Sequence, residues 1–204
     1  MAKKIISKKP LKCNRKSSKK QKPRLSFMIF TEGQTEEGYL KKFKVRCKTI
    51  KGGNALLLVE EAIIQKANVK RDHDQYWVVF DRDDCSESDF IKAINLAEKN
   101  GLKVAYSCEA FELWWLFHFI QIQAPIQRKE YEKKIKQHIQ EYTYSEKGLI
   151  QGQLMWILLN KSLNTGIKNA KQAHQKFQHP AIAYHQSVTT VYELVELLLE
   201  NSSL

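Results

Sequence analysis

The sequence predicts an α/β fold in which helices flank a parallel sheet, followed by a C-terminal helical extension. Between residues 25 and 106, short apolar runs alternate with segments whose apolar residues recur at helical spacing. This alternation of strands and helices is typical of a parallel sheet covered by helices. After Ser107 the pattern is helical throughout. We therefore expect an α/β core at residues 25–107 and a helical extension packed on it at residues 108–204.

The first half of the core is predicted to contain two strands and two helices. Residues 25–31 are mostly apolar, as in a strand buried on both faces. Thr35 can cap the helix that follows, whose first turn is acidic. A short second strand is expected at residues 47–50, and residues 55–67 have apolar positions at helical spacing.

The second half of the core contains the clearest strand, at residues 76–80, which stops at an acidic turn. Ser88 is expected to open the next helix. Asn100 and Gly101 are expected to end it, because glycine readily adopts the left-handed backbone found after a helix. Residues 102–106 form the last predicted strand.

The extension is predicted to be a series of helices. Its last helix begins at a capping box, with Thr190 at the cap and Glu193 three residues later. The other expected helices lie at residues 111–122, 130–142, 153–163 and 167–177.

The positive charge of the chain is concentrated at its N-terminus. The formal net charge is +12, yet eleven of the 34 Lys and Arg residues lie within residues 1–24, which contain no acid. Such a segment has too little apolar surface to fold alone, so we expect a disordered basic tail. It favours contact with RNA or DNA, and a solubility segment without a target is the alternative. The candidate nucleic-acid-binding residues are Lys16, Lys19, Lys20, Lys22, Arg24, Lys41 and Lys42.

Three acidic residues lie directly after predicted strands and indicate a metal site. Glu32 follows the first strand, and Asp81 and Asp83 follow the strand at residues 76–80. In open α/β sheets, sites form outside the carboxyl ends of the strands, so we expect these carboxylates to converge. Mg²⁺ or Mn²⁺ prefers such oxygen ligands. An isolated pair of aspartates more often caps helices or faces solvent, but the combination with Glu32 favours the metal site.

Two further acids and a glycine are candidates of second rank. Glu36 and Glu112 could hold a second metal or orient the other ligands. Glu112 lies among large apolar residues, where a carboxylate is costly unless it meets a cation or a donor, so a purely structural partner is an equal alternative. The surrounding aromatic residues are expected to be core. Gly33 lacks a Cβ atom and would let backbone or a substrate phosphate approach closely.

Several other classes of protein are disfavoured. The chain has no P-loop motif for nucleotide hydrolysis, and its cysteines and histidines lack zinc-finger spacing. A Cys108–His118 nucleophile would lack an orienting third group. The four cysteines form no C-x-x-C pair and, without a secretory signal, predict free thiols in a reducing cytoplasm. The most apolar stretch is too short and too interrupted to span a membrane.

An ordered set of motifs resembles the RloB-like proteins, over nearly the whole chain after the tail. The motifs are Thr31-Glu32-Gly33-x-Thr35-Glu36, Val79-Phe80-Asp81-x-Asp83, Ser107 with Phe111-Glu112-x-Trp114, His118-Phe119, and the last-helix segment at residues 187–199.

The resemblance implies a core similar to the Toprim fold, which primases, topoisomerases and overcoming-lysogenization-defect nucleases share. It implies a three-layer fold with a four-stranded parallel sheet flanked by helices. In it, Glu32 would match the Toprim glutamate, and Asp81 and Asp83 the D-x-D metal ligands. It also implies an ATPase partner and a role in restriction or phage defence in prokaryotes.

The chain departs from the family pattern at two loops. The family usually has Ser-Asn-Pro before the Phe-Glu pair, whereas this chain has Ser107-Cys108-Glu109. The Asn-Pro-Ser-Thr that often precedes the last helix appears as His185-Gln186-Ser187-Val188-Thr189. If the missing Asn and Pro shape the entrance of the site, the altered loop would change the substrate or weaken the activity.

The function predicted from these observations is a cytoplasmic, metal-dependent phosphodiesterase that cleaves nucleic acid. Asp81 and Asp83 would hold Mg²⁺, which polarises the scissile phosphate and lowers the pKa of a bound water. Glu32 would bind the metal or act as general acid or base. The alternative is a non-catalytic nucleic-acid- or nucleotide-binding subunit of an ATPase complex, whose binding would be strongly salt-dependent.

Overall fold

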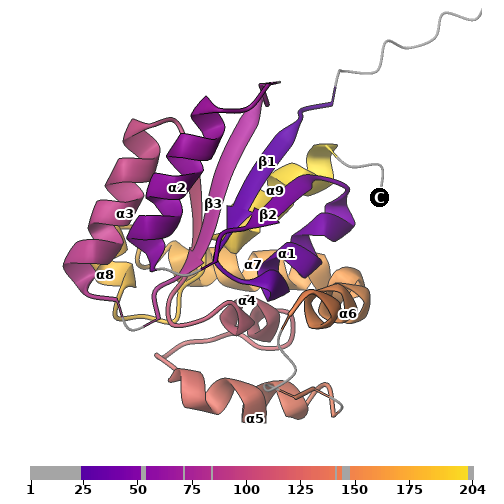
Figure 1. Ribbon diagram of the computed structural model, residues 1–204. Coiled ribbons are helices and arrows are strands. Elements are labelled where there is room, and N and C mark those ends of the chain that lie inside the picture. The colour runs from indigo at the N-terminus through magenta and orange to yellow at the C-terminus, as the bar shows by residue number, and fades with distance from the viewer. Residues whose placement is uncertain are drawn as a thin grey trace, which may run out of the picture.

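The computed structural model describes residues 24–51, 54–70, 72–83, 85–140, 142–143 and 148–201. Its four strands form one fully parallel sheet in the order β2-β1-β3-β4 (Figure 1). The prediction of a parallel sheet flanked by helices is confirmed. The strands are β1 Phe27–Thr31, β2 Arg46–Thr49, β3 Gln75–Asp81 and β4 Lys103–Ser107.

Two helical layers cover the sheet, because successive residues of each strand face opposite sides. Phe30, Val78 and Phe80 pack against α2 (Ala55–Ala67) and α3 (Glu87–Lys99) on one side. Ile29, Trp77 and Val79 pack on the other side against a larger cluster supplied by the remaining long helices. These are α1 Gln34–Leu40, α4 Glu112–Phe117, α6 Leu149–Leu159, α7 Leu163–His174 and α9 Val191–Asn201.

Short elements complete the described structure. They are η1 Lys41–Phe43, η2 Arg128–Glu130, α5 Tyr131–Lys136, η3 Asn160–Ser162 and α8 Pro180–Ala183. Helices α4 and α5 lie beyond the carboxyl ends of the strands, at the bottom of Figure 1. No helix in the described ranges is long and apolar enough to cross a membrane.

Two helix starts differ from the prediction. Gly33, not Thr35, is the N-cap of α1, because the helix begins only two residues after β1 ends. Thr35 instead accepts a hydrogen bond from the Gly148 N–H at 2.9 Å. The α3 helix begins two residues earlier than expected from Ser88, because Ser86 accepts the Asp89 N–H at 3.1 Å.

The helix predicted at residues 111–122 is shorter in the structure and ends at Phe117. The side-chain amide of Asn169 donates to the carbonyl of Phe117 at 2.8 Å and thereby terminates α4. The predicted helix at 130–142 likewise ends early, at Lys136. The predicted C-cap of α3 is confirmed, with Asn100 at the cap and Gly101 at a φ of 67°.

Helices α6 and α7 begin about four residues before their predicted starts at residues 153 and 167. The early start of α6 lets it pack directly on α1 through glycines. A Cβ atom at Gly152 would overlap the Thr35 carbonyl and lie 2.8 Å from the Tyr39 backbone nitrogen. Because the two helix backbones touch there, α6 fixes the position of α1 against the sheet.

The segment before α9 is attached to β4 rather than capped as predicted. Ser107 and Thr189 form an antiparallel bridge, and the Thr190 hydroxyl accepts the Tyr106 N–H at 2.9 Å. The Glu193 carboxylate accepts from the Tyr192 hydroxyl at 3.1 Å instead of turning back to the cap. The predicted capping box is therefore replaced by bonds that join α9 to the sheet.

The basic tail lies mostly outside the described residues. Lys16, Lys19, Lys20 and Lys22 are among the residues that the structure does not describe, so their role stays a prediction, while Arg24 is described and exposed. In the described part of the chain the cysteines Cys47, Cys85 and Cys108 are free thiols, and Cys13 lies outside that part.

Candidate metal and phosphate site

Adjacent central strands place Glu32 and Asp81 next to each other. Thr31 of β1 pairs with Val79 of β3, and the Glu32 N–H continues the ladder by donating to the Val79 carbonyl at 3.2 Å. Asp81 is the last residue of β3, and its N–H donates to Glu32 Oε2 at 3.4 Å. Parallel pairing therefore brings together two carboxylates that are 49 positions apart in the chain.

Two helices add further carboxylates to the same place. Glu36 comes from the first turn of α1 and Glu112 from the first turn of α4, and both side chains are buried. A cavity of about 350 Å³ lies at this end of the sheet. Its lining includes all five predicted carboxylates (Glu32, Glu36, Asp81, Asp83, Glu112) together with Gly33, Thr49, Lys51 and Arg128.

The pKa values of two of these carboxylates, Asp81 and Glu32, are raised. Burial is the main reason why the pKa of Asp81 lies well above its usual value, and the charges of Glu36, Glu112, Asp83 and Glu32 add to it. Burial also raises the pKa of Glu32 to about 7. The Asp81 N–H and the Arg128 charge lower the pKa of Glu32, whereas Asp83 raises it. If all five carboxyl groups were ionised, their negative charge would exceed the positive charge of Lys51 and Arg128 in the cavity lining.

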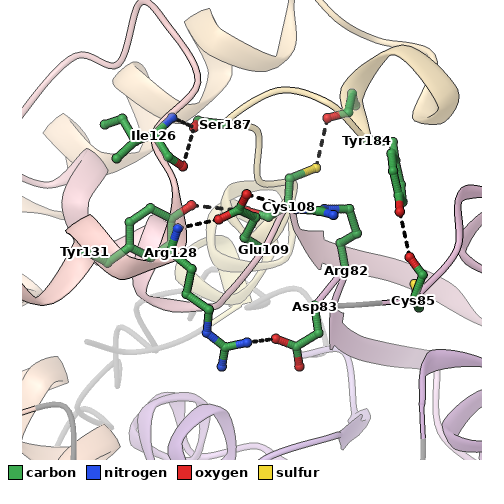
Figure 2. Close-up of polar contacts among 11 residues, drawn as sticks. Arg82, Asp83, Cys85, Cys108, Glu109, Ile126, Arg128, Tyr131, Tyr184 and Ser187 are labelled. Carbon is green, nitrogen blue, oxygen red and sulfur yellow. Dashed lines mark hydrogen bonds and ion pairs between the residues drawn. The ribbon is translucent and has the colours of Figure 1, made fainter.

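Asp83 is turned toward an arginine. Its carboxylate forms an ion pair with the Arg128 guanidinium, as Figure 2 shows. Its φ of 42° lies in the left-handed region, which is unfavourable for a residue with a Cβ atom. Of the described His, Cys, Asp and Glu side chains, no three are already arranged as a coordination group. The predicted metal site therefore remains a prediction.

The donor set nevertheless fits a hard divalent cation. All the acidic ligands offer oxygen atoms, and the raised pKa values of Glu32 and Asp81 are the effect that a bound cation would reverse. Gly33 also has a structural role here. A Cβ atom at this position would overlap the Glu36 carboxylate, so the glycine keeps room for that acid.

Glu112 lies at the cavity, and its two predicted roles, site residue or structural partner, both stay predictions. It lines the cavity, and its charge raises the pKa of Asp81. Its aromatic neighbours Phe111, Trp114 and Trp115 are buried in the core, as predicted.

The predicted role of the body lysines Lys41 and Lys42 in nucleic-acid binding stays a prediction. The ammonium of Lys41 pairs with Glu37 on the preceding turn, and Lys42 is half-buried. Glu37 is itself structural, because its carboxylate also accepts the Thr49 N–H at 3.1 Å and thereby joins α1 to β2.

Arg128 and Lys51 are cavity residues that sequence reasoning missed. Lys51 follows β2 at the carboxyl edge of the sheet, so the rule that identified Glu32 could also have identified it. Arg128 lies in η2, 45 positions from Asp83, and has no local signal.

The loops that depart from the family pattern hold the segment around Arg128 (Figure 2). One carboxylate oxygen of Glu109 pairs with Arg82 Nη2 at 3.1 Å, and the other accepts the Arg128 N–H. Ser187 accepts the Ile126 N–H at 2.8 Å. The unusual Glu109 and Ser187 loops therefore join the 126–128 segment to the turn that carries Asp83.

The Cys108–His118 pair is not formed. The Cys108 thiol donates to the Ala183 carbonyl at 3.0 Å, and burial raises its pKa to about 12. His118 Nδ1 lies 3.1 Å from the Ser162 hydroxyl, and burial lowers the pKa of the imidazole to about 3. A thiol and an imidazole in these states cannot act together as nucleophile and base.

A model of one protein family matches the chain. Its description is RloB-like protein, and the match spans residues 27–198. No curated protein and no solved structure matches the chain. The matched range contains every carboxylate of the cavity and the loops that hold Arg128.

Proposed function

The chain belongs to the RloB-like protein family, and from that premise we propose that it is a metal-dependent phosphodiesterase that cleaves nucleic acid. The observation that carries the proposal is the cavity at the carboxyl end of the sheet, where five carboxylates meet beside Arg128 and Lys51. The family resemblance supports a Toprim-like core. The same resemblance supports a role in prokaryotic phage defence with an ATPase partner.

The role proposed for each residue of the cavity follows from where it lies. Glu32 and Asp81, which lie next to each other, would hold Mg²⁺ or Mn²⁺ together with Asp83. Held there, such an ion would supply polarisation of the scissile phosphate and a lower pKa for the attacking water. If Glu32 does not hold the ion, it would instead accept the proton of the attacking water, because it lies next to Asp81 in the same cavity. Glu36 and Glu112, behind Asp81, would orient these ligands.

The cations on or next to the edge strand β2 (the β2 cations) are better placed than Lys41 to hold a phosphate backbone. Lys44, Arg46, Lys48 and Lys51 are exposed, and none of them has an ion pair within the described part of the chain. Lys48 contacts only the neutral Gln65 side chain, at 2.8 Å. Since Lys51 also lines the cavity, we propose that a strand of RNA or DNA follows this edge to the carboxylates.

The second candidate is a nucleic-acid- or nucleotide-binding subunit without activity of its own. The specific observation in its favour is the ion pair of Asp83 with Arg128, which occupies one of the predicted ligands. In that case an ATPase partner would have to rearrange the site before any cleavage.

Incubation with labelled RNA and DNA separates the two candidates. The nuclease predicts products with Mg²⁺ that disappear with a chelator and in Asp81→Asn, while circular dichroism shows an intact fold. The matched control Glu98→Gln changes an exposed acid of α3 and should cleave normally. A mobility shift without products would favour the binding subunit, and unchanged cleavage by Asp81→Asn would refute the proposed site.

A further inference from the structure

We propose that Arg128 holds Asp83 only until a divalent cation binds. Asp83 then leaves Arg128 to bind the cation, and the freed guanidinium binds the substrate phosphate. The inference rests on the proposed function. It adds a coupling between metal binding and substrate binding, carried by one ion pair.

The geometry places both partners of the exchange in one cavity. Arg128 and Asp83 line the same space as Glu32 and Asp81, and Nη1 of Arg128 donates to the Asp83 carboxylate. A guanidinium binds carboxylates and phosphates through the same planar set of N–H donors. A phosphate that enters the cavity would therefore be an alternative partner of the same kind for Arg128.

The backbone of Arg128 is fixed while its side chain is accessible. The Arg128 N–H is held by Glu109, and Ile126, two residues earlier, is held by Ser187. The ion pair itself is partly solvated, with 36% of the Arg128 side chain and 38% of the Asp83 side chain exposed. Because exposed ion pairs contribute little to stability, the guanidinium can turn while its Cα position is kept.

The charges of the cavity favour the exchange. Arg128 lines the cavity together with five carboxylates and pairs with one of them, so it supplies part of the positive charge that they need. A divalent cation among the carboxylates supplies more charge at the same place and releases Asp83 from Arg128. The entering phosphate then needs a cation, which Arg128 provides.

The substitution Arg128→Gln has effects of opposite sign on the two ligands. Mn²⁺ alone, titrated into the full chain by calorimetry or electron paramagnetic resonance, should bind up to about fivefold tighter than to the wild type, because Asp83 loses its competitor. Binding of a labelled oligonucleotide, measured at saturating Mn²⁺ on a phosphorothioate analogue that resists cleavage, should weaken about tenfold or more. Arg128→Lys keeps the charge and should recover part of that loss.

The neighbouring substitution Lys129→Gln is the matched control, because it removes one exposed positive charge from the same segment. It should leave Mn²⁺ affinity unchanged and weaken the oligonucleotide less than Arg128→Gln does. Unchanged or weaker Mn²⁺ binding by Arg128→Gln would overturn the exchange and indicate a supporting role for the arginine. If Mn²⁺ binds the wild type but not Asp81→Asn, the proposed site stands whatever Arg128 does. Failure of the wild type to bind Mn²⁺ would overturn both.

Discussion

The crowded carboxylates should make the metal-free protein less stable at high pH, and Glu32→Gln should relieve this. The ordinary carboxyl pKa of 4.5 is raised to about 7 at Glu32, mainly by burial. A difference of one in pKa corresponds to about 1.4 kcal/mol. Ionising Glu32 therefore costs the folded state on the order of 3 kcal/mol. The side chain is only half-buried, so we expect a measured effect of about 1–3 kcal/mol.

The sign follows from proton linkage. The folded state holds the Glu32 proton more tightly than the unfolded chain does. This stabilisation is complete below pH 4.5 and is lost as the pH rises to about 7. Glu32→Gln should therefore match the wild type at pH 5 and be more stable than the wild type at pH 8.

Urea unfolding in EDTA, followed by tryptophan fluorescence at both pH values, measures this difference. The lowered pKa of the buried His118 makes its own contribution to stability rise with pH, opposite to that of Glu32. This contribution is the same in the variant and the wild type, so it cancels when their free energies of unfolding are compared. Glu98→Gln, at an exposed site on α3, should show the same difference at both pH values. A Glu32→Gln protein that is less stable than the wild type at pH 8 would refute the electrostatic reasoning.

Two other predictions test the scaffold and the substrate surface. Gly152→Ala should lower the free energy of unfolding by about 1–3 kcal/mol, measured by urea unfolding, because the new methyl group meets the backbone of α1; an unchanged value would contradict the close α1–α6 contact. Replacing the β2 cations Lys44, Arg46 and Lys48 by Gln should reduce the salt dependence of oligonucleotide binding, by about 0.7–0.9 in slope for each lost phosphate contact. An unchanged slope would place the nucleic acid elsewhere. The matched control carries the same change at three lysines of α5, Lys133, Lys134 and Lys136.

The parallel sheet and the approach of Glu32 to Asp81 could be predicted because both depend on local patterns. Each strand is a short apolar run, and a residue that ends a parallel strand necessarily lies at the same edge as its neighbours. Glu32, Asp81 and Asp83 follow from that rule alone. The rule would also have identified Lys51.

Long-range contacts set the features that could not be predicted. The end of α4 depends on Asn169, which lies 52 positions from Phe117. The start of α6 depends on glycine contacts with α1, and the direction of Asp83 depends on Arg128. In each case the local sequence leaves the outcome open, and a contact with a distant part of the chain decides it.

Anomalous diffraction from crystals soaked in Mn²⁺ tests most directly whether the carboxylate cavity binds a divalent cation. We predict a peak within ligand distance of Glu32, Asp81 and Asp83, with Arg128 turned away from Asp83. A peak that none of these carboxylates touches, or no peak in the cavity at saturating Mn²⁺, would contradict the proposal.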